Sequence, residues 1–226
     1  MTIRAIVTDI EGTTTSVRFV TDTLFPWSRA RLRDYVLAHE AELTAILDAV
    51  RAEQGDAALS TAEVIAVLEA WHDADRKIGP LKTLQGLIWE QGYADGHLRG
   101  HVYPDVAPAL RRWQAAGLQL HVYSSGSVAA QRLLFGHSEA GDLTGLFSGW
   151  FDTAVGPKRE VASYRAIAQA IGTEPDTILF LSDVVDELEA ARGAGFATYL
   201  LARDGSPAAG EHRVAASFDT LQLEAD

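Results

Sequence analysis

The sequence of 226 residues contains no cysteine. That absence excludes disulfide bonds, thiolate metal sites and a cysteine nucleophile. Basic residues are also scarce, since 19 lysines and arginines stand against 31 acidic residues and give a formal net charge of −12. Nucleic-acid-binding proteins carry a basic surface, so this balance argues against that class. A small anionic substrate is compatible with it, because a pocket or a bound cation can outweigh the overall field.

Long hydrophobic runs are missing too. No apolar stretch approaches the ~20 residues that span a bilayer. The N-terminal segment MTIRAIVTDIEG lacks the charged start, the long apolar stretch and the small-residue cleavage site of a signal peptide. We therefore expect a soluble, cytoplasmic protein without a membrane partner.

Helical periodicity dominates the first half of the chain. Between residues 22 and 93 apolar side chains recur at helical spacing, and no strand pattern is evident. Ser60 and Glu63 predict a capping box at the start of one helix. Gly79 and Pro80 are expected to end that helix, and another is expected over residues 81–91. We interpret residues 21–99 as an all-helical insertion.

The rest of the chain alternates between strand and helix patterns. Apolar, β-branched strands are expected at residues 3–8, 118–123, 151–154, 177–181 and 197–201. Helices are expected between them, and residues 204–212 are expected to form a loop. This alternation predicts an α/β fold, in which a doubly wound, Rossmann-like parallel sheet forms the core from residues 1–20 and 100–226.

Polar clusters follow three of the predicted strands. In chain order they are Asp9 with Glu11, Ser124 with Ser125, and Asp183 with Asp186 and Glu187. In a doubly wound sheet, ligands bind outside the carboxyl ends of the strands. We therefore expect the three clusters to converge on one crevice, with the loop that contains Lys158 beside them.

The residue types suggest phosphoryl chemistry. A carboxylate such as Asp9 can attack phosphorus and form an aspartyl phosphate. Hydroxyls and free backbone N–H groups before a helix, as at Ser124 and Ser125, make a phosphate site. Lys158 would add a positive charge. A few hard oxygen ligands beside a phosphate suit Mg²⁺.

Each cluster also has a structural interpretation. Asp9 and Glu11 before Gly-Thr could form a polar turn, and SSGS is a common helix cap. Lys158 could be a solvated loop lysine, and Asp183 could be a helix N-cap followed by first-turn acids that the helix dipole favours. The joint occurrence of all four, in this order at one predicted sheet edge, favours the functional interpretation.

The order DIEGTT, YSSGS, Lys158 and SDVVDE resembles the four motifs of the haloacid dehalogenase superfamily, and the match covers the whole chain. Most members have Asp-x-Asp-Gly-Thr as the first motif, whereas Glu11 replaces the second aspartate here and Thr14 follows. Together with the insertion and the segment LKTLQGLIWEQGY at residues 81–93, this variant resembles the enolase-phosphatases of methionine salvage, also called acireductone synthases.

The resemblance implies roles for the acidic residues. Asp9 would be the nucleophile and a metal ligand, and Asp183 the remaining acidic metal ligand. Glu11 would contact the metal through its backbone carbonyl and act as general acid/base with its side chain. Glu187 matches the second acid of the last motif and is expected to support the ligands from behind. Asp186 lies off the pattern and is expected to be exposed.

The same resemblance implies that Ser124, Ser125 and Lys158 bind the substrate phosphate, with one Mg²⁺ per subunit. The insertion would be a cap that excludes water and carries specificity. Lys82, Gln85 and Trp89, about one helical turn apart, are candidates for substrate contact. The alternative is that Trp89 belongs to a core and the other two are solvated.

The activity implied is conversion of a methylthio-diketopentyl phosphate to the corresponding acireductone and phosphate, by a monomer. Three alternatives stay open at this point. They are a general small-molecule phosphatase of the superfamily, a metal-independent dehalogenase, and a catalytically silent binding module. The acids around Asp183 argue against the dehalogenase, and the complete motif set argues against the silent module.

Overall fold

A computed structural model describes residues 2–203, 205 and 212–223. The loop expected at residues 204–212 lies largely outside this part. The chain divides into two compact units, one of Met1–Val17 with Arg99–Asp226 and one of Arg18–Leu98. In the described residues, no helix combines the length and the apolar character needed to cross a membrane.

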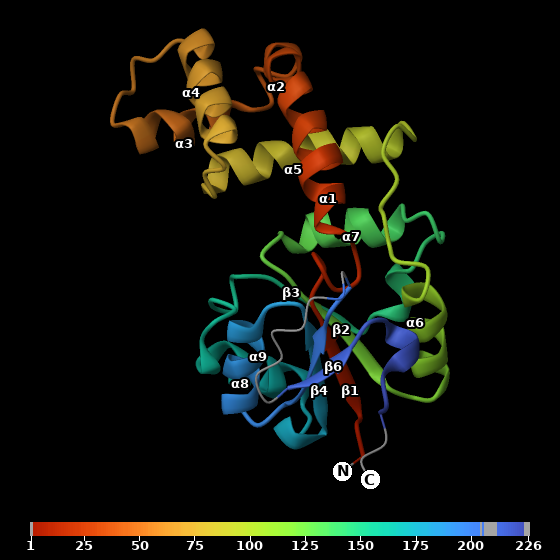
Figure 1. Cartoon of the computed structure of the whole chain (residues 1–226). Coiled ribbons are helices and arrows are strands. Elements are labelled where there is room, and N and C mark those ends of the chain that lie inside the picture. Colours follow the sequence, from red (N-terminus) through yellow and green to blue (C-terminus); the bar gives the residue numbers. More distant parts are fainter. Residues whose placement is uncertain (1, 204, 206–211, 224–226) are drawn as a thin grey trace. The chain divides into compact units, whose positions relative to one another are not determined.

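The first unit is built on a parallel sheet (Figure 1). Its strands are β1 (Ala5–Thr8), β2 (Gln119–Tyr123), β3 (Gly149–Phe151), β4 (Ile178–Ser182), β5 (Ala197–Leu201) and β6 (Arg213–Ala215). They lie in the order β3-β2-β1-β4-β5-β6, and every neighbouring pair is parallel. The predicted doubly wound α/β core is confirmed. The strand expected at residues 151–154 instead begins at Gly149 and ends at Phe151.

Helices cover both faces of this sheet. They are α6 (Val106–Ala115), α7 (Val128–Gly136), α8 (Val161–Ile171) and α9 (Val185–Gly193), with 3-10 turns at Thr144–Leu146, Pro175–Thr177 and Phe218–Thr220. Alternate residues of β1 and β4, such as Val7 and Phe180, pack with α8 and α9 in one core cluster. Helix α6 packs against β2, and α7 against β3. Because β1 is buried along its whole length, its first three residues, Ala5, Ile6 and Val7, are apolar, and only Thr8 at its carboxyl end is polar.

In the second unit every regular element is a helix, and loops connect the helices (Figure 1). Its elements are α1 (Val17–Phe19), a π-helical turn at Val20–Leu24, α2 (Phe25–Ala38), α3 (Thr44–Gln54), α4 (Thr61–Asp73) and α5 (Gly79–Ala94). Its core consists of buried apolar side chains from α2 to α5, among them Leu32, Val50, Leu68 and Ile88.

The helix boundaries in this unit follow local chemistry. The capping box is confirmed, because the Glu63 N–H donates to Ser60 Oγ at 3.4 Å and the Ser60 N–H donates to Glu63 Oε2 at 2.8 Å. The prediction that Gly79 and Pro80 end α4 is wrong: α4 ends at Asp73, and these two residues begin α5. Proline suits the first turn of a helix, where its missing N–H would have no partner.

Replacement of Leu68 by alanine should destabilise the helical unit. Leu68 is fully buried in its core, and removing a buried leucine side chain costs about 2–5 kcal/mol through lost burial and the cavity left behind. Urea denaturation followed by circular dichroism measures the loss. Leu37→Ala on α2 is the control, because Leu37 is 55% exposed and its loss should change stability by under ~0.5 kcal/mol. Equal effects of the two changes would contradict this core assignment.

Candidate active site

Asp9 immediately follows β1, at the carboxyl end of the sheet. Its N–H donates to the Leu181 carbonyl at 2.9 Å, which continues the pairing of β1 with β4. The residue is only 3% exposed. Its Oδ1 accepts a hydrogen bond from the Ile10 N–H at 2.8 Å. The strand thus delivers a buried carboxylate whose orientation is fixed by its own backbone.

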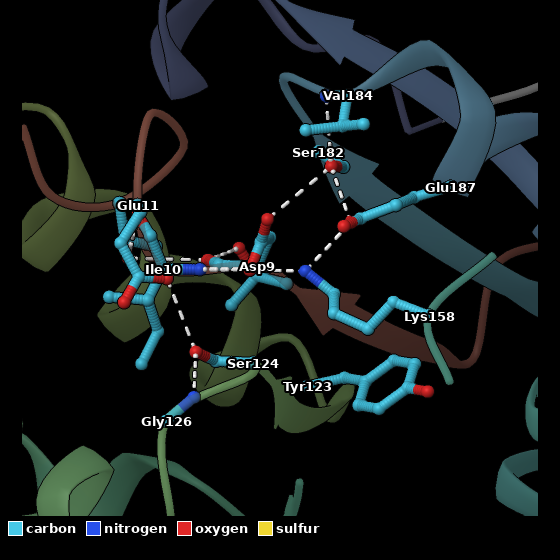
Figure 2. Close-up of polar contacts among 12 residues, drawn as sticks. Asp9, Ile10, Glu11, Tyr123, Ser124, Gly126, Lys158, Ser182, Val184 and Glu187 are labelled. Atoms are coloured by element: carbon cyan, nitrogen blue, oxygen red, sulfur yellow. Dashed lines mark hydrogen bonds and ion pairs between the residues drawn. The ribbon is translucent and has the colours of Figure 1, made fainter. Parts of the chain in front are cut away.

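Lys158 neutralises this carboxylate. Its Nζ lies 2.6 Å from Asp9 Oδ1 and 2.7 Å from Glu187 Oε2 (Figure 2). Burial lowers the pKa of Lys158, but the charges of Asp9 and Glu187 more than offset it, so its pKa lies above the ordinary value. Lys158 therefore carries its positive charge at every working pH. The interpretation of Lys158 as a solvated loop residue is wrong, because the side chain is 7% exposed.

Ser182, the last residue of β4, connects Asp9 with Glu187 on α9. Its Oγ lies 3.0 Å from Glu187 Oε2 and 3.4 Å from Asp9 Oδ2, and it accepts the Val184 N–H at 3.1 Å (Figure 2). Burial, and then the charge of Asp9, raise the pKa of Glu187 to about 7. Ser182 is not among the site residues predicted from the sequence, although its position directly before Asp183 at a strand end is a usable signal.

Asp183 follows β4 and lies against the loop after β1. A Cβ atom at Gly12 would lie 2.0 Å from Asp183 Oδ2, and Gly12 has φ +75°, so both the space and the backbone require glycine here. In the part of the chain that the structure describes, the buried Oδ1 of Asp183 has no hydrogen-bond partner. Burial, and then the charge of Asp9, raise the pKa of Asp183 to about 6.

Glu11 and Ser124 meet across the ends of β1 and β2. The Ser124 hydroxyl donates to Glu11 Oε2 at 3.2 Å and accepts the Gly126 N–H at 3.1 Å (Figure 2). Burial, and then the nearby charge of Asp9, raise the pKa of Glu11. Ser125 is exposed beside them. The last serine of SSGS, Ser127, is the N-cap of α7, so the segment contains both a helix cap and a site serine.

An arginine outside the motifs holds the loop after β1. Arg203 Nε and Nη2 donate to the Thr13 carbonyl at 2.9 and 2.7 Å, and its Nη1 lies 2.8 and 2.7 Å from the two carboxylate oxygens of Asp105. The guanidinium also lies over the Tyr103 ring, 4.3 Å from its centroid. No local sequence pattern indicates this pairing, because Arg203 and Asp105 are far apart in the chain.

The candidates in the helical unit all lie on α5. Gln85 is buried and Lys82 is half-buried. The indole N–H of Trp89 donates to the Leu24 carbonyl at 2.8 Å, and its ring stacks on Phe25 with centroids 6.2 Å apart. Trp89 therefore has a packing role inside its own unit. A role of these three residues in substrate contact stays a prediction.

The carboxyl edge of the sheet thus brings together a defined set of charged and polar groups. Asp9, Lys158, Ser182 and Glu187 form one network, and Glu11 and Ser124 form a hydrogen-bonded pair beside it (Figure 2). Asp183 lies against the same loop at Gly12. By contrast, Asp186 is exposed on α9, as expected. A buried carboxylate with a neutralising lysine, next to a carboxyl of raised pKa, can perform nucleophilic and acid–base steps on a phosphate ester.

Known proteins resemble this chain along its whole length. The family model of haloacid dehalogenase-like hydrolases matches residues 3–195. The enolase-phosphatase E1 of Pseudomonas aeruginosa (strain LESB58) is 59% identical over 226 residues, which cover 99% of this chain and 100% of that protein. The crystal structure of the UTR4 protein from Saccharomyces cerevisiae has a TM-score of 0.82 at 33% identity, covering 97% of this chain and 100% of that one.

More distant structures share the fold alone. An L-2-haloacid dehalogenase from Xanthobacter autotrophicus has a TM-score of 0.57 at 20% identity, covering 96% of this chain and 95% of that one. The identity to the enolase-phosphatase E1 of Pseudomonas aeruginosa, 59% over 226 residues, is far higher. The chain is therefore an enzyme of the haloacid dehalogenase-like hydrolases and belongs, within them, to the enolase-phosphatase E1 family.

Proposed function

We propose that the chain converts a methylthio-diketopentyl phosphate to a dihydroxy-methylthiopentenone, the acireductone, and inorganic phosphate in methionine salvage. The observation that carries this proposal is the buried ion pair of Asp9 with Lys158 at the end of β1, with Glu11 two residues further on. The name and full-length similarity of the enolase-phosphatase relatives support the choice of substrate.

The phosphoryl transfer has two steps. After enolisation of the substrate, an oxygen of Asp9 attacks phosphorus, and the bond from phosphorus to the enol oxygen breaks. Glu11, whose pKa is raised by burial and by the charge of Asp9, gives a proton to the leaving enol oxygen in its acid form. Water then attacks the aspartyl phosphate and gives a proton to Glu11, which releases phosphate and restores Asp9.

The phosphate would be bound by Lys158, Ser124 and Ser125, and the 2.6 Å contact of Lys158 with Asp9 supports this assignment. Lys158 supplies a fixed positive charge, and Ser124 supplies a hydroxyl at the end of β2. Ser125 and the backbone N–H groups that lead into α7 extend this cradle. Ser182 and Glu187 hold Lys158 and Asp9 from the opposite side.

The residues at the site fit a magnesium ion. No group of three or more acidic or histidine side chains within the described residues could hold a metal. Mg²⁺, however, needs only one or two carboxylates and takes its other oxygens from water and substrate. Asp9, Asp183 with its unpartnered Oδ1, and the Glu11 carbonyl supply such a set for one ion per subunit. When bound, the ion would neutralise charge on the phosphate and polarise the substrate oxygens.

The remaining assignments follow from the same proposal. The helical unit Arg18–Leu98 would act as the cap that carries specificity, with Lys82 and Gln85 as substrate contacts. The enzyme would work as a monomer in the cytoplasm, with a small phosphorylated diketone as its partner.

Asp9→Asn should lower the rate of phosphate release by at least ~10³-fold, because the amide cannot serve as the nucleophile. The measurement is phosphate release from the diketone phosphate with saturating Mg²⁺. Asp186→Asn is the control: this acid is exposed on α9, and its change should leave the rate within twofold. Near-normal turnover by Asp9→Asn would show that Asp9 is not the nucleophile.

The substrate assignment is tested with a panel. We expect the methylthio-diketopentyl phosphate to give both phosphate and the enediol, the latter followed by its ultraviolet absorbance. Simple sugar phosphates of the same charge should react with a kcat/KM at least about 100-fold lower, because they lack the enolisable diketone. An equal or higher kcat/KM for the sugar phosphates would indicate a general phosphatase instead.

Asp183→Asn should stabilise the magnesium-free protein at pH 8. The pKa of Asp183 is raised to about 6, so its contribution to stability is present below about pH 4 and is lost as the pH rises through 6. The asparagine carries no charge, and its advantage in Tm should shrink as the pH falls from 8 to 4.

Thermal denaturation in EDTA at several pH values measures this difference. Added Mg²⁺ should raise the Tm of the wild type more than that of Asp183→Asn, because the variant lacks one carboxylate ligand. Equal stabilisation of the two proteins by Mg²⁺ would contradict the assignment of Asp183 as a ligand.

A further inference from the structure

Three consecutive backbone carbonyls of the Lys158 loop each accept a hydrogen bond from a side-chain hydroxyl. Tyr123 donates to the Gly156 carbonyl at 2.9 Å, Ser163 to the Pro157 carbonyl at 2.7 Å, and Tyr164 to the Lys158 carbonyl at 2.7 Å. We call these three donors the hydroxyl clamp. The proposed phosphoryl transfer assigns no role to these three hydroxyls.

The clamp is anchored in rigid elements of the core. Tyr123 lies on β2, and Ser163 and Tyr164 lie on α8. Tyr123 and Tyr164 are fully buried, and their rings meet edge to face with centroids 5.5 Å apart. Tyr164 also packs edge to face on Phe180 of β4, at 5.1 Å. Burial raises the pKa of both phenols, so they remain protonated donors at every working pH.

The loop is shaped to receive these donors. Gly156 has φ +140°, and a Cβ atom there would lie 2.3 Å from the Ser163 hydroxyl. Only glycine therefore lets Ser163 reach the Pro157 carbonyl. A solvent-exposed lysine in a loop does not need hydrogen bonds to three successive backbone carbonyls to perform its role.

Fixing the backbone matters because Lys158 has a long, flexible side chain. Its four-carbon stem has many rotamers, and ordering it costs conformational entropy. Its Nζ lies between two carboxylates at 2.6 and 2.7 Å and 5.7 Å from the centroid of the Tyr123 ring (Figure 2). Because the Tyr164 hydroxyl donates to the Lys158 carbonyl, the backbone from which the lysine side chain extends is fixed.

We propose that Tyr123, Ser163 and Tyr164 are positioning residues that hold the backbone of residues 156–158, so that Lys158 Nζ stays beside Asp9. This inference rests on the proposed function for the role of Lys158 in phosphoryl transfer. Its geometric part, the placement of Lys158, can be measured without substrate.

The first experiment compares two tyrosine-to-phenylalanine variants. Tyr164→Phe removes the hydroxyl that holds the Lys158 carbonyl. Tyr199→Phe is the matched control, because Tyr199 is a buried sheet residue of the same unit whose hydroxyl donates to the distant Gln222 carbonyl. Each variant loses one hydrogen bond, so the Tm of each should fall by about 2–4 °C.

Activity should separate the two variants. Measured well below both melting temperatures, kcat should fall roughly tenfold for Tyr164→Phe, because small misplacements of a catalytic group are costly, and should stay within twofold for Tyr199→Phe. Adding Tyr123→Phe to Tyr164→Phe should deepen the loss. A merely structural role would lower Tm equally in both variants and leave both kcat values unchanged.

The second experiment measures how accessible Lys158 Nζ is to acetylation, which depends on its position between the two carboxylates. The chain contains three lysines, and Lys77 and Lys82 belong to the helical unit. Competitive acetylation followed by peptide mass spectrometry gives the rate at Lys158 relative to these two internal standards. The relative rate should rise several-fold in Tyr164→Phe, as Nζ escapes its carboxylates, and should not change in Tyr199→Phe.

The outcomes separate the clamp from the proposed function. An unchanged relative labelling rate of Lys158 in Tyr164→Phe overturns the clamp, whatever the activity. If Lys158 is labelled faster in Tyr164→Phe but kcat is unchanged, the clamp is not important for catalysis. If the wild type releases no phosphate from any panel substrate, the proposed function fails, while the labelling result still decides whether the hydroxyls place Lys158.

Discussion

The site depends on one buried ion pair, between Lys158 and Asp9. An isolated buried carboxylate would be too costly and would take up a proton. Lys158 places its ammonium against Asp9, which is only 3% exposed, and against Glu187. Acidic side chains outnumber the one lysine at this edge of the sheet, which suits a cation. Burial first, and then the charge of Asp9, raise the pKa values of Glu11, Asp183 and Glu187.

Much of the surrounding structure serves to hold that pair in place. Asp9 is fixed from β1 and β4, the loop after β1 is fixed by Arg203 with Asp105, and the loop of Lys158 is fixed by hydroxyls from β2 and α8. Each of these hydrogen bonds is made by a backbone carbonyl or N–H group of the site and not by the reacting atoms. The chemistry is thereby confined to a few side chains, and the geometry is supplied by the sheet and the helices packed on it.

The sequence predicted those parts of the molecule that local patterns encode. Asp9 could be found because an apolar strand ends in it, and Ser60 with Glu63 because a capping box is a local motif. The ion pair of Arg203 with Asp105 and the hydrogen bonds of the Tyr123 and Tyr164 hydroxyls could not be predicted, because each joins atoms that are brought together only by folding. Gly79 with Pro80 was misassigned because the same dipeptide can stop one helix or start the next.

The central place of β1 also has a consequence for biosynthesis. Ala5 pairs with Gln119 on one side and with Ile178 on the other. An emerging chain therefore presents a largely apolar strand whose second neighbour, β4, is synthesised only after the helical unit, β2 and β3. Residues 18–98 have their own core and can fold before the strands that pair with β1 have been synthesised. A ribosome stalled before residue 178 would hold a chain with a folded helical unit and no complete active site.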